Sequence, residues 1–203
     1  MPDNSEYFAV FERFLPKEAA KYCYGLWNEL GFEFKITKAR KTKLGDFRYD
    51  PRTQKSTISV NHNLNQYAFL VTYLHEVAHH ITNKQFGRKV SPHGKEWKNN
   101  FKKISLPVLN PSVLPKEILE ALAGYLKNPA ATSCSDPNLT RVLNGYSETD
   151  DKVLLMDIPI GSVFVFNKKI YQSLERKRTR FVCKDIKSGN KYLINGAARV
   201  KKY

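Results

Sequence analysis

The chain has 203 residues, of which 41% are hydrophobic, and this composition is that of an ordinary globular protein with one large domain or one medium and one small domain. The formal net charge of +15 and the pI near 9.7 favour polyanionic partners such as nucleic acid over acidic or neutral ones. Three widely spaced cysteines argue against a disulfide framework and against a cysteine-based zinc knuckle.

Neither a signal peptide nor a membrane span is expected from the sequence. Asp3, Glu6 and Glu12 interrupt the region where a basic start and an apolar run would be needed for secretion. No apolar run approaches the roughly 18 residues that a membrane span requires. We therefore expect a cytoplasmic protein without a membrane partner, which DNA binding would associate with the nucleoid.

The first half of the chain carries helical and strand-like patterns in alternation. Between Pro16 and Gly31, apolar residues recur at helical spacing, and a glycine is the usual left-handed helix terminator. Three short β-like runs then predict a small antiparallel sheet: residues 32–36, 44–49 and 56–60. The strongest helical pattern of the chain follows, from about residue 64 to 83.

Two more helices are expected in the second half of the chain, at residues 93–104 and 115–127. The composition changes after them. Residues 128–150 have the composition of a linker or long loop, rich in Pro, Ser and Asn. Short runs rich in Val, Phe, Ile and Tyr then predict a small all-β module. The expected protein is of the α+β class, with a domain at 1–127, a linker at 128–150 and a β-rich module at 151–203.

The helix expected at residues 64–83 contains the motif H-E-x-x-H, formed by His75, Glu76 and His79. Residues four apart lie on the same face of a helix, so both imidazoles can point at one ion. A catalytic zinc ion takes three protein ligands and leaves one position for water, so a third ligand must be found.

Two candidates for the third ligand lie in the segment after this helix. The longer motif H-E-x-x-H-x-x-G-x-x-H is excluded, because Thr82 and Gln85 occupy its glycine and its last histidine positions. His93 lies near the start of the next helix, from which it can fold back over the first, and we prefer it. Glu96, one turn further, is the competing ligand, a partner of a ligand, or a solvated charge.

These motifs match the pattern of a known family. The run HEVAH at 75–79, followed by HGKEW at 93–97 and preceded by ISVN at 58–61, resembles the SprT-like metalloprotease domain over roughly residues 10–127. That family includes DNA-dependent proteases that degrade proteins crosslinked to DNA. The resemblance implies a compact zincin-like α+β fold in which the strand before the zinc helix borders the substrate cleft.

Carried over residue by residue, the resemblance makes His75, His79 and His93 the ligands of one catalytic zinc ion and Glu76 the catalytic glutamate. Many family members also carry a four-cysteine zinc ribbon after the protease domain. Only two cysteines, at positions 134 and 183, occur in the corresponding part of this chain. We therefore expect no structural zinc, and interpret the terminal module as a metal-free replacement of the ribbon.

The terminal module is strongly basic. Residues 151–203 contain thirteen Lys and Arg against four Asp and Glu. If the run LERKRTRF is extended, Arg176, Arg178 and Arg180 project from one face of a strand. A line of guanidinium groups suits nucleic-acid phosphates, although the solvated side of a hairpin gives the same pattern.

The sequence thus predicts a zinc endopeptidase that hydrolyses proteins associated with DNA. The first alternative is a zinc peptidase acting on ordinary protein substrates without DNA dependence. The second is a non-catalytic nucleic-acid-binding protein with a structural or idle histidine site. Glu76 argues against the second alternative, because a purely structural zinc site needs no general base.

Overall fold

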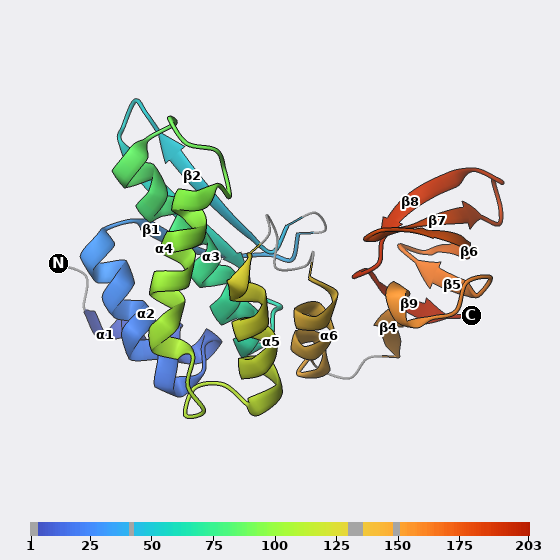
Figure 1. Cartoon of the computed structure of the whole chain (residues 1–203), viewed down its shortest axis with the longest axis horizontal. Coiled ribbons are helices and arrows are strands. Elements are labelled where there is room, and N and C mark those ends of the chain that lie inside the picture. Colours follow the sequence, from blue (N-terminus) through green and yellow to red (C-terminus); the bar gives the residue numbers. More distant parts are fainter. Residues whose placement is uncertain (1–3, 41–42, 130–135, 148–150) are drawn as a thin grey trace. The chain divides into compact units, whose positions relative to one another are not determined.

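The computed structural model describes residues 4–40, 43–129, 136–147 and 151–203 (Figure 1). It confirms the α+β class, with helices and two separate sheets. The chain divides into two compact units, the first made of residues 1–133 and 142–147 and the second of residues 134–141 and 148–203. Among the helices of the described residues, none has the length and apolar character needed to cross a membrane.

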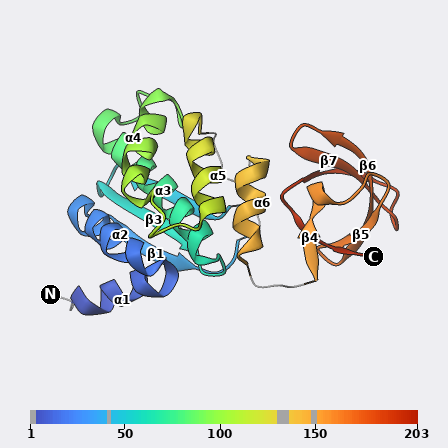
Figure 2. The same cartoon turned by 60° about the horizontal axis from the view of Figure 1, so that its bottom comes forward.

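The first unit packs helices around a three-stranded sheet (Figures 1 and 2). Its elements are α1 (Asn4–Phe14), α2 (Lys17–Leu30), β1 (Glu33–Thr37), β2 (Gly45–Asp50), β3 (Lys55–Asn61), α3 (Gln66–Phe86), α4 (Lys95–Ser105), the 3-10 turn η1 (Leu106–Val108) and α5 (Lys116–Lys127). The sequence patterns indicated all of the longer elements except α1. Helix α3 begins where the Asn65 side chain accepts hydrogen bonds from two backbone N–H groups of the first turn.

The small sheet is mixed, so the expectation of an antiparallel sheet was wrong for one strand pair. Its order is β1-β3-β2, with β3 antiparallel to β2 but parallel to β1. The reason is the path of the chain, which reverses direction twice before β3 and then places β3 between its two predecessors. Strand β2 is therefore an edge strand, and β3 is the central one.

One face of this sheet packs against α3. Phe34, Ile58 and Phe47 are aligned across the three strands, and Phe34 contacts the ring of Tyr73 of α3 at 5.3 Å between centroids. Every residue of α3 from Phe69 to Ala78 is buried. Helix α3 is therefore a central helix, enclosed by the sheet on one side and by α4 on another.

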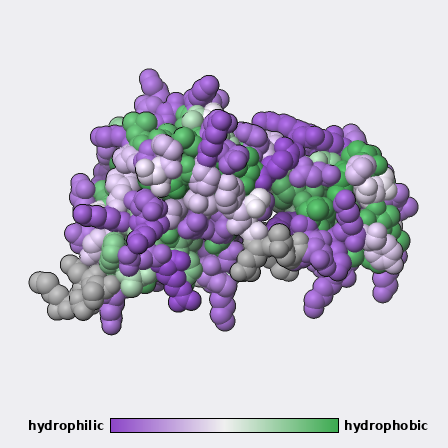
Figure 3. Space-filling model, turned by 90° about the horizontal axis from the view of Figure 1, so that it is seen from below, coloured by the Kyte–Doolittle hydropathy of each residue, from purple (hydrophilic) through white to green (hydrophobic). Residues whose placement is uncertain are grey.

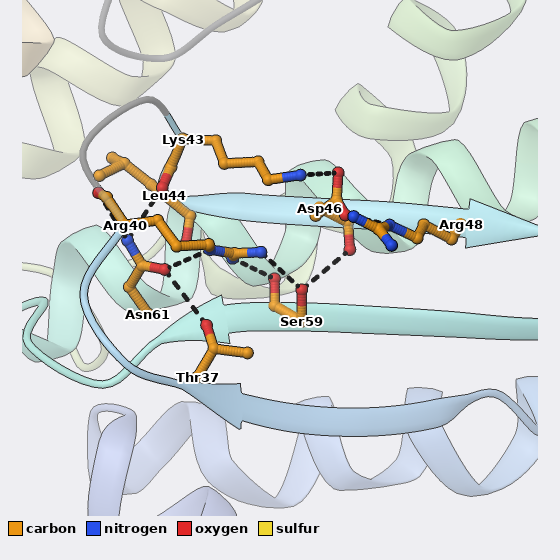
Figure 4. A network of polar contacts seen from close by, with 8 residues as sticks. All are labelled: Thr37, Arg40, Lys43, Leu44, Asp46, Arg48, Ser59 and Asn61. Atoms are coloured by element: carbon orange, nitrogen blue, oxygen red, sulfur yellow. Dashed lines mark hydrogen bonds and ion pairs between the residues drawn. The ribbon is translucent and has the colours of Figure 1, made fainter.

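The opposite face of the sheet carries a polar network (Figure 4). Arg40, from the connection after β1, donates to Asn61 Oδ1 at 2.7 Å and to Ser59 Oγ at 3.0 Å. Asn61 in turn donates its Nδ2 to the Lys43 carbonyl at 2.9 Å. These bonds satisfy the buried amide of Asn61 and tie the segment before β2 to the central strand.

The second unit contains a six-stranded antiparallel sheet of order β4-β9-β5-β6-β7-β8. Its elements are β4 (Lys152–Leu154), the 3-10 turn η3 (Leu155–Asp157), β5 (Val163–Phe166), β6 (Lys169–Lys177), β7 (Arg180–Asp185), β8 (Lys191–Asn195) and β9 (Arg199–Lys202). Leu155, Phe164, Cys183 and Val200 are fully buried in its core.

On the face shown in Figure 3, hydrophilic side chains project from both units.

Part of the expected linker is helical. Helix α6 (Pro137–Gly145) lies within residues 128–150, and it contributes residues to both units. The Asp136 carboxylate accepts a hydrogen bond from the Leu139 N–H at 2.7 Å, and proline suits the first helical position. Linker residues 130–135 and 148–150 lie outside the described part of the chain.

Candidate metal centre

Three imidazoles converge in the first unit. The Nε2 atoms of His75 and His79, from α3, lie 3.2 Å apart, and the Nε2 atom of His93 lies 2.8 Å from that of His79 and 3.2 Å from that of His75. Zinc–nitrogen bonds of 2.0–2.1 Å in a tetrahedron place two ligand nitrogens about 3.3 Å apart. The donor set and its spacing therefore fit a single zinc ion.

His93 reaches the other two histidines because the chain turns sharply before α4. Its backbone adopts a left-handed conformation with a φ of 61°. The next residue, Gly94, donates its N–H to the Ser91 carbonyl at 2.9 Å, and an added Cβ would lie 2.9 Å from that oxygen. A strained non-glycine residue beside a required glycine is a common feature of functional sites.

Glu96 does not join this group of potential ligand atoms, which lie within 4.8 Å of one another. Its carboxylate lies beside the backbone turn, where an added Cβ on Gly94 would meet Glu96 Oε2 at 3.4 Å. The geometry thus favours His93 over Glu96 as the third potential ligand.

The ring of the buried Trp97 packs against all three imidazoles. The Trp97 ring centroid lies 4.7 Å from that of His75, 5.3 Å from that of His79 and 4.6 Å from that of His93. Phe101 stacks on its other side at 5.1 Å. Because all these rings pack together, the imidazole orientations are fixed by the core.

The environment keeps the imidazoles neutral. Burial, with repulsion from the other two histidines, lowers the pKa of His75 to about 2, and burial together with His93 lowers the pKa of His79 to about 4. Burial also lowers the pKa of His93. Metal ligation requires neutral imidazoles, so the site is in its ligating form at neutral pH.

Glu76 lies beside the histidines and is only 8% exposed. Burial and, to a smaller extent, the negative charge of Asp46 raise the pKa of its carboxyl group to about 8, against the opposing effects of Arg40 and the Phe47 backbone N–H. A nearby positive charge favours the ionised carboxylate. A cation bound by the three imidazoles would therefore lower the pKa of Glu76 and favour its ionised form.

Strand β2 approaches Glu76 closely because it begins with a glycine. A Cβ on Gly45 would lie 2.6 Å from Glu76 Oε1 and 2.7 Å from Thr72 Cγ2. The sequence reasoning missed both Gly45 and Phe47. A glycine inside an expected strand, which often marks close approach of another group, was the available signal for Gly45.

Strand β2 lies beside the three histidines; that the strand directly before this helix borders the substrate cleft, as the family resemblance implied, stays a prediction. Strand β3 is in the middle of the sheet, and its Ile58 and Val60 are fully buried. The Phe47 ring of β2 instead lies almost parallel to that of His79, with centroids 6.3 Å apart.

His80 does not belong to the three-histidine group. It is buried between Phe32 and Phe47, with ring centroids 5.3 Å and 5.9 Å away. Neither of its ring nitrogens has a partner at hydrogen-bonding geometry. Burial lowers its pKa, an effect that the nearby Leu30 carbonyl partly opposes.

The three arginines at 176, 178 and 180 do not share one face, because the run that contains them is a hairpin. Strand β6 ends at Lys177, a turn with Arg178 at a φ of 50° follows, and Arg180 pairs with Lys177. Arg176 is opposite Phe181 in the register, so it and Arg180 lie on opposite faces. All three arginines are nevertheless exposed around the hairpin end.

The fold and this site define an α+β protein with a candidate three-histidine metal centre, formed by two histidines of its central helix and one from the turn before α4. The chain belongs to the SprT-like family, because the pattern of that family matches residues 10–115, just over half of its length. Comparisons with curated proteins and with solved structures gave no significant match.

Proposed function

We propose that this protein is a zinc-dependent endopeptidase of the SprT-like, zincin-like type. The observation that carries the proposal is the convergence of three neutral imidazoles, two from α3 and one from the turn before α4, beside the buried glutamate of α3. Family membership supports it, since the SprT-like pattern covers all four residues. His75, His79 and His93 would hold one zinc ion, and Glu76 would act as the general base.

The bound zinc ion would act as a Lewis acid toward water and the scissile carbonyl group. Glu76 would accept the proton of the attacking water and pass it to the nitrogen of the leaving amine. The Phe47 N–H would hold the carboxylate in place during both transfers. Trp97 and Phe101 would keep the imidazoles oriented and exclude water from behind them.

Metal analysis and a proteolysis assay test the proposal together. The purified protein should contain about one zinc per chain. Cleavage of an unfolded protein substrate should stop after chelation and return when zinc is added. Cleavage that persists in the chelated, zinc-free protein would contradict the proposal.

Gly45→Ala is expected to lower the cleavage rate by about 100-fold, because displacing a catalytic group by about 1 Å has an effect of that size. The added methyl group would occupy the space of the Glu76 carboxylate and the Thr72 methyl group. Gly25→Ala is the matched control, since nothing lies within 4 Å of its added Cβ. Zinc content should be unchanged in both variants, and equal activities would show that Gly45 does not position Glu76.

We further propose that the substrates are proteins associated with DNA. The support is the basic second unit, where Arg176, Arg178 and Arg180 are exposed around one hairpin end. None of the three forms an ion pair within the described residues. Guanidinium groups on a protruding hairpin suit phosphate contacts that do not depend on base sequence.

Replacing Arg176, Arg178 and Arg180 together with alanine should weaken DNA binding and flatten its salt dependence. Each lost phosphate contact lowers the slope of log K against log salt by about 0.7–0.9. The matched control replaces three exposed lysines in other turns or strand ends of the same unit: Lys168, Lys187 and Lys191. If titrations show the same loss for both triple variants, the hairpin assignment is wrong.

A peptidase without DNA dependence is the second candidate function. The observation that favours it is that all four proposed catalytic-site residues belong to the first unit. Measuring cleavage of a DNA-binding protein and of a protein that does not bind DNA, each with and without DNA, separates the two. Equal rates in all four reactions would favour this second candidate.

A further inference from the structure

A broad groove lies at the end of the first unit's sheet, away from the three-histidine group. It is formed where the start of β1 and the hairpin between β2 and β3 diverge from the last two turns of α3. Its volume is about 1100 Å³, slightly above the range of roughly 300–1,000 Å³ that is usual for pockets that hold small molecules. The groove is therefore large enough for a ligand.

The rim of this groove is cationic. Lys55, Lys84 and Arg88 line it, and none of them forms a hydrogen bond or an ion pair within the described part of the chain. Glu33 is the acidic residue of the lining; it pairs with Lys35 at 2.9 Å, and the nearby charge of Lys55 also lowers its pKa. Lys84 and Arg88 therefore leave the groove with an excess of positive charge.

The inner wall of the groove includes His80, which is 6% exposed. Neither buried ring nitrogen has a partner at full hydrogen-bond geometry, and the Leu30 backbone, which partly opposes the lowering of its pKa, interacts with it only weakly. Buried polar groups without partners are rare and lower stability, so such a residue calls for an explanation. If a ligand entered the groove and displaced the residues that bury the His80 ring, it would form a full hydrogen bond with one of the ring nitrogens.

None of His75, Glu76, His79 and His93 lines this groove. The Phe47 ring lies near both His79 of the three-histidine group and His80 of the groove, with centroids 6.3 Å and 5.9 Å away. The groove is therefore a second site, distinct from the proposed catalytic one.

We propose that this groove binds a phosphate-bearing ligand. The phosphate lies between Lys84, Arg88 and Lys55, since a dianion matches several cations that have no internal partner. The organic part of the ligand extends toward Phe32 and bonds to a nitrogen of His80. Either a free nucleotide or a phosphate of a nucleic-acid strand supplies this chemistry.

Calorimetric titrations test the proposal and separate the two sources. The probes are inorganic phosphate, deoxyadenosine monophosphate and a short single-stranded oligonucleotide. They are added to the full chain in which the hairpin arginines 176, 178 and 180 have been replaced by alanine. Because no peptide substrate is present, the result does not depend on whether the protein is a protease.

The double variant Lys84→Ala with Arg88→Ala should weaken probe binding at least tenfold. Lys89→Ala is the matched control, because Lys89 is exposed next to Arg88 but does not line the groove. It should change the dissociation constant by less than about twofold.

His80→Phe keeps an aromatic ring but removes both nitrogens. It should weaken mononucleotide binding several-fold while the melting temperature stays the same or rises, because two unpartnered polar atoms have been removed. If His80 only packs in the core, mononucleotide binding should be unchanged in this variant. If this variant does not fold, the Lys84 and Arg88 variant still decides the question.

Mononucleotide binding that is lost in the double variant identifies a nucleotide site. Binding of the oligonucleotide alone, lost in the same variant, identifies a nucleic-acid strand as the source. The proposal is overturned if none of the three probes binds at millimolar concentration, or if Lys89→Ala weakens binding as much as the double variant.

Discussion

Glu76→Gln should reduce the rate of peptide-bond cleavage by about 10²–10⁴-fold, the contribution that a general acid–base group makes. Glutamine has nearly the same volume as glutamate, and its amide oxygen can still accept the hydrogen bond from the Phe47 N–H. It cannot accept the proton of the attacking water. The variant therefore removes the ability of the side chain to accept a proton, and it preserves the packing of this residue, which is only 8% exposed.

The measurement is the cleavage rate at saturating substrate, with the zinc content and melting temperature of the same preparation. Both of these should match the unmodified protein, because the three imidazoles are untouched. Glu18→Gln, at an exposed position in the first turn of α2, is the control for losing one negative charge. A Glu76→Gln variant that cleaves within tenfold of the unmodified rate would contradict the role of Glu76 as general base.

The sequence contained enough local information to predict the helical part of the candidate site. The spacing of His75 and His79 on a helix follows from the periodicity of α3, which no distant contact changes. His93 needed a further step, because its approach depends on the left-handed turn before α4. Its place near the start of the next helix already favoured His93, the family resemblance implied the same residue, and the observed Nε2 distances agree with both.

The strand that completes the site was harder to predict, because strand pairing is not local. Nothing in the run around Gly45 shows that β2 is at the edge of the sheet and passes Glu76. Thr72, one helical turn before Glu76 on α3, is also buried close to Gly45. The position of one strand therefore decides which backbone groups reach the glutamate.

The arginine run shows a similar limit in the second unit. An alternating pattern predicts one face only if the strand continues, and here Arg178 and Thr179 form a hairpin turn. Neither residue is a usual turn former, since such turns favour Asn and Gly. The cross-strand pairs from Tyr171–Asp185 to Lys177–Arg180 fix the turn at that point, and they are tertiary information.

His93→Ala should weaken zinc binding by at least about 100-fold, since even the loss of a hydrogen-bonding partner of a ligand costs 10–100-fold. Two imidazoles would remain on α3, with their Nε2 atoms 3.2 Å apart, and the third donor would be replaced by water. Cleavage should fall with zinc occupancy. Competition with a chromophoric chelator measures the affinity, and added zinc should restore little activity at micromolar concentration.

Glu96→Ala is the comparison variant for this experiment, because the sequence also allowed the Glu96 carboxylate to be the third zinc ligand. Glu96 lies one helical turn beyond His93 and outside the group of converging donor atoms. Its loss should change the zinc affinity by less than about tenfold, the lower bound for an outer partner. If Glu96→Ala loses more zinc than His93→Ala, the carboxylate is the ligand. The loop that carries His93 would then have to rearrange when the ion binds.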